Sequence, residues 1–284
     1  LHKAIRRQRQ MCIRDRRYAS EQGLKVLQPV KLRDPEFAAE LEALKPDLGV
    51  VIAFRMLPES VWNLPRLGTF NLHASLLPQY RGAAPINWAI INGETETGIT
   101  TFMLNHQIDT GDILGQQRTP ITPDDNVGTL YDRLMEMGKG LVIETVERIA
   151  AGTAARTVQN NIPESEIKPA PKIFKEDCRI DWHRKGRRII DFIRGLSPYP
   201  AAWTGMFRDG SDEMQTAKIF AATFEEAAHG APCGTVESDG RTFIRVACSD
   251  GWIRIEELQI AGKKRLAVRE LLLGWRDVLQ YRFE

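Results

Sequence analysis

Polar side chains interrupt an apolar stretch near residue 70, and their types suit acyl transfer. In the run "FNLHAS" (70–75), apolar residues alternate with Asn71, His73 and Ser75. Alternation with a period of two places Asn71 and His73 on the same face of a strand, roughly 6.6 Å apart along it. An amide can donate a hydrogen bond to a carbonyl oxygen, and an imidazole can move a proton, so the pair can assist attack on a carbonyl carbon.

A second group of polar residues follows about 30 residues later. The segment "LNHQIDTGDIL" (104–114) holds Asn105, His106, Asp109 and Asp112 after an apolar run. Ligands of open α/β sheets bind beyond the carboxyl ends of strands, and consecutive strands are usually neighbours. We therefore expect the two polar groups to lie side by side. A histidine, an asparagine and a carboxylate that converge there favour an acyl-transfer site.

Other interpretations of these residues remain open at this point. A lone histidine in a strand is more often structural, and Asn or Asp at strand ends often only caps a loop or helix. From spacing alone, the catalytic and structural interpretations have about equal support. A metal site has less support, because the sequence contains neither H-x-x-x-H nor H-E-x-x-H spacing.

The surrounding periodicity predicts the elements that would position these residues. Strands are expected at 48–54, 69–75 and 98–105, and helices near 59–62, at 85–93 and at 126–152. This alternation favours an α/β domain whose parallel sheet is covered by helices. After a Pro-rich polar stretch, a helix at 184–195 and several short strands predict a small β-barrel or sandwich.

Composition limits the function classes. The chain has 284 residues, of which 43% are hydrophobic and 27% charged, which is typical of a soluble protein with two domains. No run approaches the roughly 20 apolar residues of a membrane helix, and the basic start has no apolar core, so it is no secretory signal. The four cysteines are scattered, which fits a reduced, cytoplasmic setting.

Three stretches resemble one known family. They are "FNLHASLLPQYRGAAPINWAIINGETETGITTFMLNHQIDTGDIL", "IDWHRKGRRIIDFIRGLSPYPAAW" and "LQIAGKKRLAVRELL". They resemble the folate-dependent formyltransferases, and within that family the members that act on methionyl-tRNA. The resemblance implies a Rossmann-like parallel-sheet formyltransferase domain at 18–155, a linker at 156–172 and a C-terminal tRNA-binding β-barrel domain, similar to an oligonucleotide-binding fold, at 173–284.

The resemblance also implies how the chain begins. The family's usual first strand, helix and second strand have no counterpart here. We therefore expect residues 1–17, which carry a net charge of +6, to be a non-native head on a formyltransferase domain that is truncated at its start.

The resemblance assigns roles to particular residues. Asn71, His73 and Asp109 match the family's catalytic trio, the donor would be 10-formyltetrahydrofolate, and the acceptor would be the α-amino group of initiator methionyl-tRNA. No metal is expected. The expected folate contacts are Arg55, Met56, Leu57, Ser75, Leu76, Leu77, Pro78 and Gln107. The expected tRNA contacts are Lys263, Lys264, Arg265, Arg187 and Arg188, although a solvated side chain is an equally good interpretation of each lysine. We expect a cytoplasmic monomer that binds no membrane.

Two rival functions share these features. Another two-domain formyltransferase, acting on an amino-sugar nucleotide, or a formyl-folate hydrolase would carry the same trio. A folate- or RNA-binding protein without turnover is an alternative from a different class.

Overall fold

The computed structural model describes residues 15–52, 57–159 and 162–284. It contains two compact units, one of residues 1–49 and 54–69 and the other of residues 50–53 and 70–284. Most of the predicted head, residues 1–14, lies outside the described residues, and so do Arg55 and Met56.

After the helical residues 15–21, the described part of the first unit contains helices α2 and α3, of which α3 lies at its predicted position. Helix α2 spans Pro35–Ala43, with Pro at its first position and Asp34 as N-cap. The Asp34 carboxylate accepts a hydrogen bond from the backbone N–H of Glu36 at 3.0 Å, which satisfies one of the unpaired donors of the first turn. Helix α3 spans Glu59–Trp62.

A four-stranded sheet forms the base of the predicted site. Its strands lie in the order β1 (Gly49–Ile52), β2 (Thr69–His73), β3 (Glu96–Met103) and β4 (Ile113–Pro120). The expectation of parallel neighbours does not hold for β2, β3 and β4, because β2 pairs antiparallel with β3 and β3 antiparallel with β4. Strand β4 was not expected.

Because β2 and β3 are antiparallel, the two polar segments that follow them begin at opposite ends of the strand pair. Phe70 pairs with Met103, and His73 pairs with Thr100, so the carboxyl ends of β2 and β3 lie at opposite ends of the pair. The loop after β3 therefore starts beside the first residues of β2. It can reach His73 only by folding back toward the middle of the sheet.

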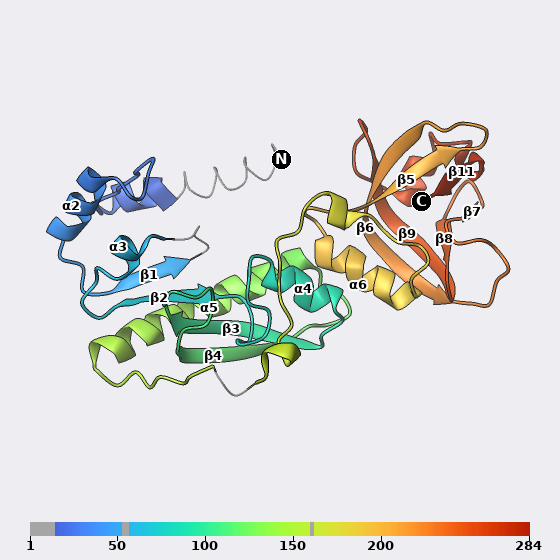
Figure 1. The fold of residues 1–284 in the computed structure, drawn as a ribbon. Coiled ribbons are helices and arrows are strands. Elements are labelled where there is room, and N and C mark those ends of the chain that lie inside the picture. Colours follow the sequence, from blue (N-terminus) through green and yellow to red (C-terminus); the bar gives the residue numbers. More distant parts are fainter. Residues whose placement is uncertain (1–14, 53–56, 160–161) are drawn as a thin grey trace. The chain divides into compact units, whose positions relative to one another are not determined.

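Helix α5 (Val127–Ala150) packs against β3 and β4 (Figure 1). It begins with a capping box, in which the Asn126 side chain accepts from backbone N–H groups and the Thr129 hydroxyl accepts from the Asn126 N–H. Its apolar side chains Leu130, Leu134 and Leu141 are buried. The short helix α4 (Pro85–Ile91) contributes to the same core.

The C-terminal part contains the predicted barrel. It comprises helices α6 (Gly186–Leu196) and α7 (Val268–Leu272), strands β5 (Ala202–Arg208), β6 (Met214–Glu226), β7 (Val236–Ser238), β8 (Ile244–Cys248), β9 (Gly251–Ile260), β10 (Leu266–Ala267) and β11 (Tyr281–Phe283), and short 3-10 turns at Glu164–Glu166, Glu176–Cys178 and Val278–Gln280. The strand order is β11-β5-β6-β9-β8-β7, with β10 beside β9. A bridge between Thr235 and Arg282 joins the two ends of the sheet, which closes it nearly into a barrel.

Helix α6 connects the barrel to the α/β part of the chain through α4, beside which it lies in Figure 1. The Asn87 amide donates to the Gly195 carbonyl at 2.7 Å. The Arg194 guanidinium donates to three backbone carbonyls of the loop before α5, at 2.8–3.1 Å.

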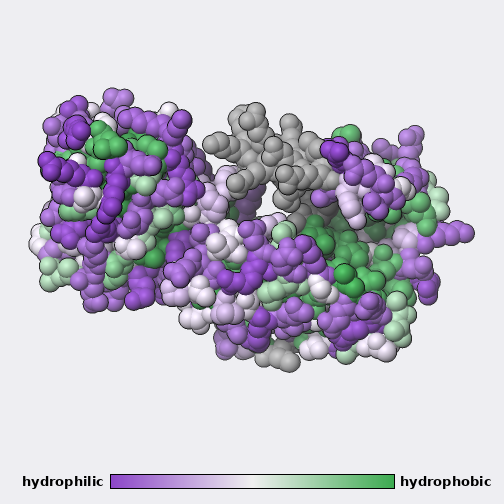
Figure 2. Space-filling view, turned by 180° about the vertical axis from the view of Figure 1, so that it is seen from behind, coloured by the Kyte–Doolittle hydropathy of each residue, from purple (hydrophilic) through white to green (hydrophobic). Residues whose placement is uncertain are grey.

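The hydropathy of the surface differs between parts of the chain. In Figure 2, hydrophilic residues cover most of the barrel, whereas hydrophobic residues gather in one area elsewhere. Among the exposed apolar side chains are Val50 and Ile52 of β1. No helix of the described residues is long and apolar enough to cross a membrane.

Candidate active site

The orientation of His73 is fixed by one backbone carbonyl. The imidazole is buried, with 6% of its surface exposed, and its Nε2 lies 2.9 Å from the Tyr80 carbonyl oxygen. A carbonyl oxygen only accepts, so Nε2 carries the proton of this hydrogen bond. The other ring nitrogen, Nδ1, faces Asp109 Oδ2 at 3.8 Å.

Asp109 is held by the opposite loop. The backbone N–H of Gly82 donates to Asp109 Oδ2 at 2.9 Å. Asp109 adopts a left-handed backbone conformation, with φ 56°, which Asp tolerates better than most residues. Two residues later only glycine fits, because a Cβ on Gly111 would lie 1.7 Å from the Met103 carbonyl oxygen. These features turn the loop back over the sheet, which brings Asp109 to His73.

Asn71 presents an amide that has no partner among the described residues. It lies two residues before His73 on β2, on the same face of the strand. Its Oδ1 is buried and accepts no hydrogen bond. A buried amide oxygen without a partner is unusual, and since the two amide ends are assigned from hydrogen-bond partners, either end can face a bound group.

Tyr80 supports the site through both its backbone and its phenol. Its backbone is left-handed, with φ 62°, and this turns its carbonyl toward His73. Its phenol donates to Glu94 Oε1 at 2.6 Å. Burial and this hydrogen bond raise the pKa of the Tyr80 phenol. Burial alone would raise the pKa of Glu94, but hydrogen bonds from Lys168 and Tyr80 lower it.

The predicted folate contacts of the 75–78 turn are engaged within the protein. The Ser75 hydroxyl donates to the Gln79 carbonyl at 2.6 Å, which shapes the turn. The Leu77 N–H donates to Thr100 Oγ1, and its carbonyl accepts from Gln116 Nε2. Leu76 and Pro78 are half-buried. These contacts fix the turn beside the trio.

Two other predicted folate contacts lie outside the 75–78 turn. Gln107 is exposed on the loop that carries Asp109, and its N–H donates to Asn105 Oδ1 at 2.9 Å. Leu57 belongs to the first unit.

Comparison with known proteins extends this picture. Residues 3–146 match the formyl transferase family, and residues 172–276 match its formyl transferase C-terminal domain. This chain belongs to the formyl transferase family. A methionyl-tRNA formyltransferase of Parabacteroides distasonis is 52% identical over 94% of this chain and 82% of its own length. One of Bacteroides thetaiotaomicron is 55% identical over 92% of this chain and 81% of its own length.

Solved structures share the formyltransferase fold at lower identity. HypX from Aquifex aeolicus in complex with tetrahydrofolic acid is 24% identical, with a TM-score of 0.61 over 85% of this chain and 41% of that one. An N-formyltransferase from Helicobacter canadensis, in complex with folinic acid and dTDP-3-aminofucose, is 22% identical, with a TM-score of 0.59 over 88% of this chain and 82% of that one. The predicted two-domain α/β and β-barrel architecture is thus confirmed.

The predicted tRNA contacts of this formyltransferase are all exposed, but they are not equivalent. Arg188 donates to the Asn92 carbonyl at 2.7 Å, at the end of α4, so it has a structural role. Arg265 is paired with Glu257 and lies over the Phe220 ring. Lys263, Lys264 and Arg187 have no side-chain partner among the described residues.

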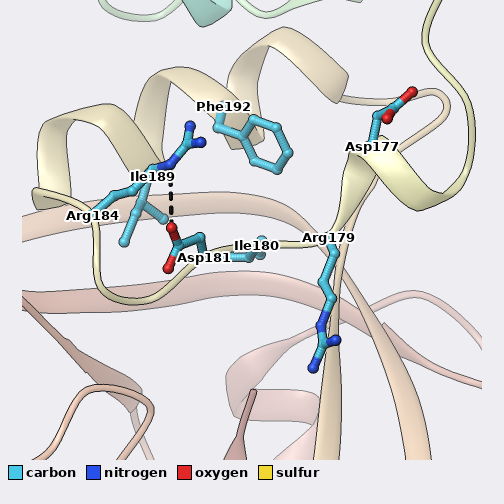
Figure 3. A pocket seen from close by; sticks show the side chains of 7 residues that line it. All are labelled: Asp177, Arg179, Ile180, Asp181, Arg184, Ile189 and Phe192. Carbon is cyan, nitrogen blue, oxygen red and sulfur yellow. Dashed lines mark ion pairs between the residues drawn. The ribbon is translucent and has the colours of Figure 1, made fainter.

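A small pocket lies away from the trio, against α6 (Figure 3). It has a volume of about 80 Å³ and is lined by Asp177, Arg179, Ile180, Asp181, Arg184, Ile189 and Phe192. Its charges compensate each other in part, because Arg184 pairs with Asp181 at 3.5 Å. No residue of the trio lines it.

Proposed function

We propose that this chain transfers the formyl group of 10-formyltetrahydrofolate to the α-amino group of methionine on initiator tRNA. The observation that carries this proposal is 52–55% identity, over more than nine-tenths of the chain, to proteins named methionyl-tRNA formyltransferase. Both domains of the family are matched. The folate bound by HypX supports a folate donor.

The site geometry suits attack by an amine on a formyl carbon. The free α-amino group has a pKa near 7.7–8.0, so much of it is neutral and nucleophilic at physiological pH. As the new C–N bond forms, negative charge develops on the formyl oxygen. The Asn71 amide and a proton on His73 Nδ1 can donate to this oxygen. One such donor is typically worth about 10²–10³ in rate.

The remaining protons can move through Asp109. Its carboxylate faces His73 Nδ1 at 3.8 Å, which is too long for a direct hydrogen bond and leaves that nitrogen available to substrate. The proton lost by the amine passes to the carboxylate, directly or through water. The charge on the formyl oxygen then returns to re-form the carbonyl, the bond between the formyl carbon and N10 breaks, and the carboxylate passes its proton to N10. This route needs neither a covalent enzyme intermediate nor a metal.

The two substrates would contact different parts of the chain. We assign the folate to Arg55, Met56, Leu57, Ser75, Leu76, Leu77, Pro78 and Gln107. For the tRNA phosphates we retain Lys263, Lys264 and Arg187, because their charges are not engaged within the described residues, whereas Arg188 and Arg265 are held by protein partners.

One assay separates this proposal from its rivals. The purified chain is incubated with 10-formyltetrahydrofolate and initiator methionyl-tRNA, and N-formylmethionine is measured by mass spectrometry after deacylation. We expect product with the wild-type chain and formation slower by about 10²–10³ with His73→Ala. Formylation of an amino-sugar nucleotide but not of the tRNA, release of formate alone, or tight binding of both substrates without transfer would each contradict the proposal.

A further inference from the structure

The segment between the two matched family ranges runs alongside the catalytic loops. It follows residue 146 and precedes residue 172. Thr157 exchanges backbone hydrogen bonds with Ile113 at 2.8 and 2.9 Å, at the start of β4. Further along, Ala170 pairs with the loop around Gly82, accepting from Ala83 N at 2.8 Å. The predicted linker is therefore in contact with both loops that meet at the trio.

Gln159, in this segment, has a buried side chain that contacts both loops. Only 5% of its surface is exposed. Its Nε2 donates to the backbone carbonyls of Asp109, at 3.1 Å, and Gly111, at 2.6 Å. Its Oε1 accepts from Arg81 Nη2 at 2.8 Å and from Arg81 Nε at 3.3 Å. Both amide protons and the oxygen are therefore used.

These contacts join Gln159 to both loops. The carbonyls that Gln159 binds flank Thr110, so they define the path of the loop that carries Asp109. Arg81 immediately precedes Gly82, whose N–H binds the Asp109 carboxylate. A left-handed backbone such as that of Asp109 persists only when its surroundings hold it in place. Gln159 supplies that restraint, because its amide nitrogen binds the loop that carries Asp109 and its amide oxygen binds Arg81.

We propose that Gln159 is a positioning residue, which holds the Asp109 carboxylate at its working distance from His73. This inference rests on the proposed formyl transfer. Gln159 touches neither reacting group in the geometry argued above, so it acts through the Asp109 and Arg81 loops. Because small displacements of catalytic groups slow reactions strongly, its loss is expected to lower kcat more than it raises KM.

Two substitutions separate its amide donors from its acceptor. Gln159→Met keeps the volume and removes every hydrogen bond. Gln159→Glu keeps an acceptor for Arg81 but has no N–H for the two carbonyls. For both variants we expect kcat of formyl transfer to fall by about 10- to 100-fold, with KM for methionyl-tRNA changed by less than about threefold.

Gln79→Met is the matched control. Gln79 also binds the linker, through the Glu166 carbonyl at 3.2 Å and the Lys168 N–H at 2.7 Å, without touching the Asp109 loop. Its kcat is expected to fall much less than that of Gln159→Met. Equal losses in the two variants would overturn the proposal, because they would reflect only a loosened linker.

The Gly82 amide provides a readout that does not depend on activity. Since Gly82 N–H donates to the Asp109 carboxylate, its protection from hydrogen exchange reports the position of that carboxylate. We expect both Gln159 variants to lose protection at Gly82 while the amides of β3 stay protected. Unchanged protection at Gly82 overturns the proposal, whatever kcat does. If the wild-type chain transfers no formyl group, the proposed function fails, but the exchange experiment still decides whether Gln159 positions Asp109.

Discussion

At the scale of single residues, the site depends on which nitrogen of His73 remains available. The Tyr80 carbonyl occupies Nε2, and this leaves Nδ1 for the reaction. The sequence predicts His73, Asn71 and Asp109 as site residues, because two short patterns carry them. It does not reveal Tyr80 or Gln159 as supports, because a backbone carbonyl acts independently of its side chain and a glutamine in a polar linker resembles any solvated residue.

The phenol of Tyr80 stabilises the loop without contributing to the chemistry. Tyr80→Phe removes its hydrogen bond to the Glu94 carboxylate, so we expect the free energy of unfolding to fall by about 1.5–3 kcal/mol. The backbone carbonyl remains, and kcat should change little. Urea denaturation and the formyl-transfer assay measure the two effects. Tyr131→Phe, at an exposed position on α5, is the control. A large loss of kcat without a loss of stability would contradict this division of roles.

At the scale of elements, the sequence did not predict the antiparallel pairing of β2, β3 and β4. Strand, helix, strand is typical of parallel pairing, but α4 has only seven residues and the turn before it reverses the chain, so β3 returns antiparallel to β2. Strand β4 was missed because "ILGQQRTP" is mostly polar and contains Gly and Pro. His73 and Asp109 still lie close together, because the 104–112 loop folds back. Their proximity was expected from parallel pairing of the strands, and that reason was wrong.

Two glycines of α5 test how closely this helix packs on β2. Glycine-to-alanine exchange inside a helix usually stabilises by about 0.5–1 kcal/mol. At Gly140 no atom lies within 4 Å of a new Cβ, so Gly140→Ala should stabilise the protein. At Gly138 the new Cβ would lie 2.7 Å from Leu72 Cδ2. We expect Gly138→Ala to be less stable than Gly140→Ala and to lower kcat, since Leu72 lies between Asn71 and His73. Equal melting temperatures and rates would contradict this.

Asp125, just before α5, gives a pH-dependent prediction. Burial would raise the pKa of its carboxyl, but hydrogen bonds from Arg133, Thr122 and Thr129 lower it. A carboxyl with a lowered pKa in the folded state stabilises the protein above its unfolded pKa, near 3.9, and this stabilisation is lost as pH falls through the folded value. Asp125→Asn should therefore destabilise by about 1–3 kcal/mol at pH 7, and the difference from wild type should shrink below about pH 4. Urea titrations at several pH values measure it, and a difference that grows on acidification would refute it.

At the scale of the whole molecule, the sequence predicted the two-domain plan and the barrel. Short alternating strands between turn residues were enough to indicate the barrel, and the family motifs indicated the catalytic domain. The sequence did not show how the parts are joined. Arg194 and Asn87 bind backbone carbonyls across the α4–α6 contact, and such contacts leave no pattern in composition or periodicity.

The lysines after β9 are expected to bind tRNA phosphates. Replacing Lys263 and Lys264 with alanine should weaken tRNA binding and reduce the slope of log affinity against log salt by about 1–2. Lys139→Ala is the control, since Lys139 pairs with Glu136 on the exposed side of α5. Filter-binding titrations over a range of salt concentrations measure the slope. If the slope of the double variant equals that of wild type, these lysines do not contact the RNA.

The cooperation of the trio is tested most directly by single-turnover rates of formyl transfer. The rates are compared for Asn71→Ala, His73→Ala, Asp109→Ala and the double variant of His73 and Asp109. We expect each single variant to lose about 10²–10³ in rate, and the double variant to be little slower than the slower of its two single variants, because His73 and Asp109 act as one unit. Near wild-type rates in any single variant, or losses at His73 and Asp109 that simply multiply, would contradict the account.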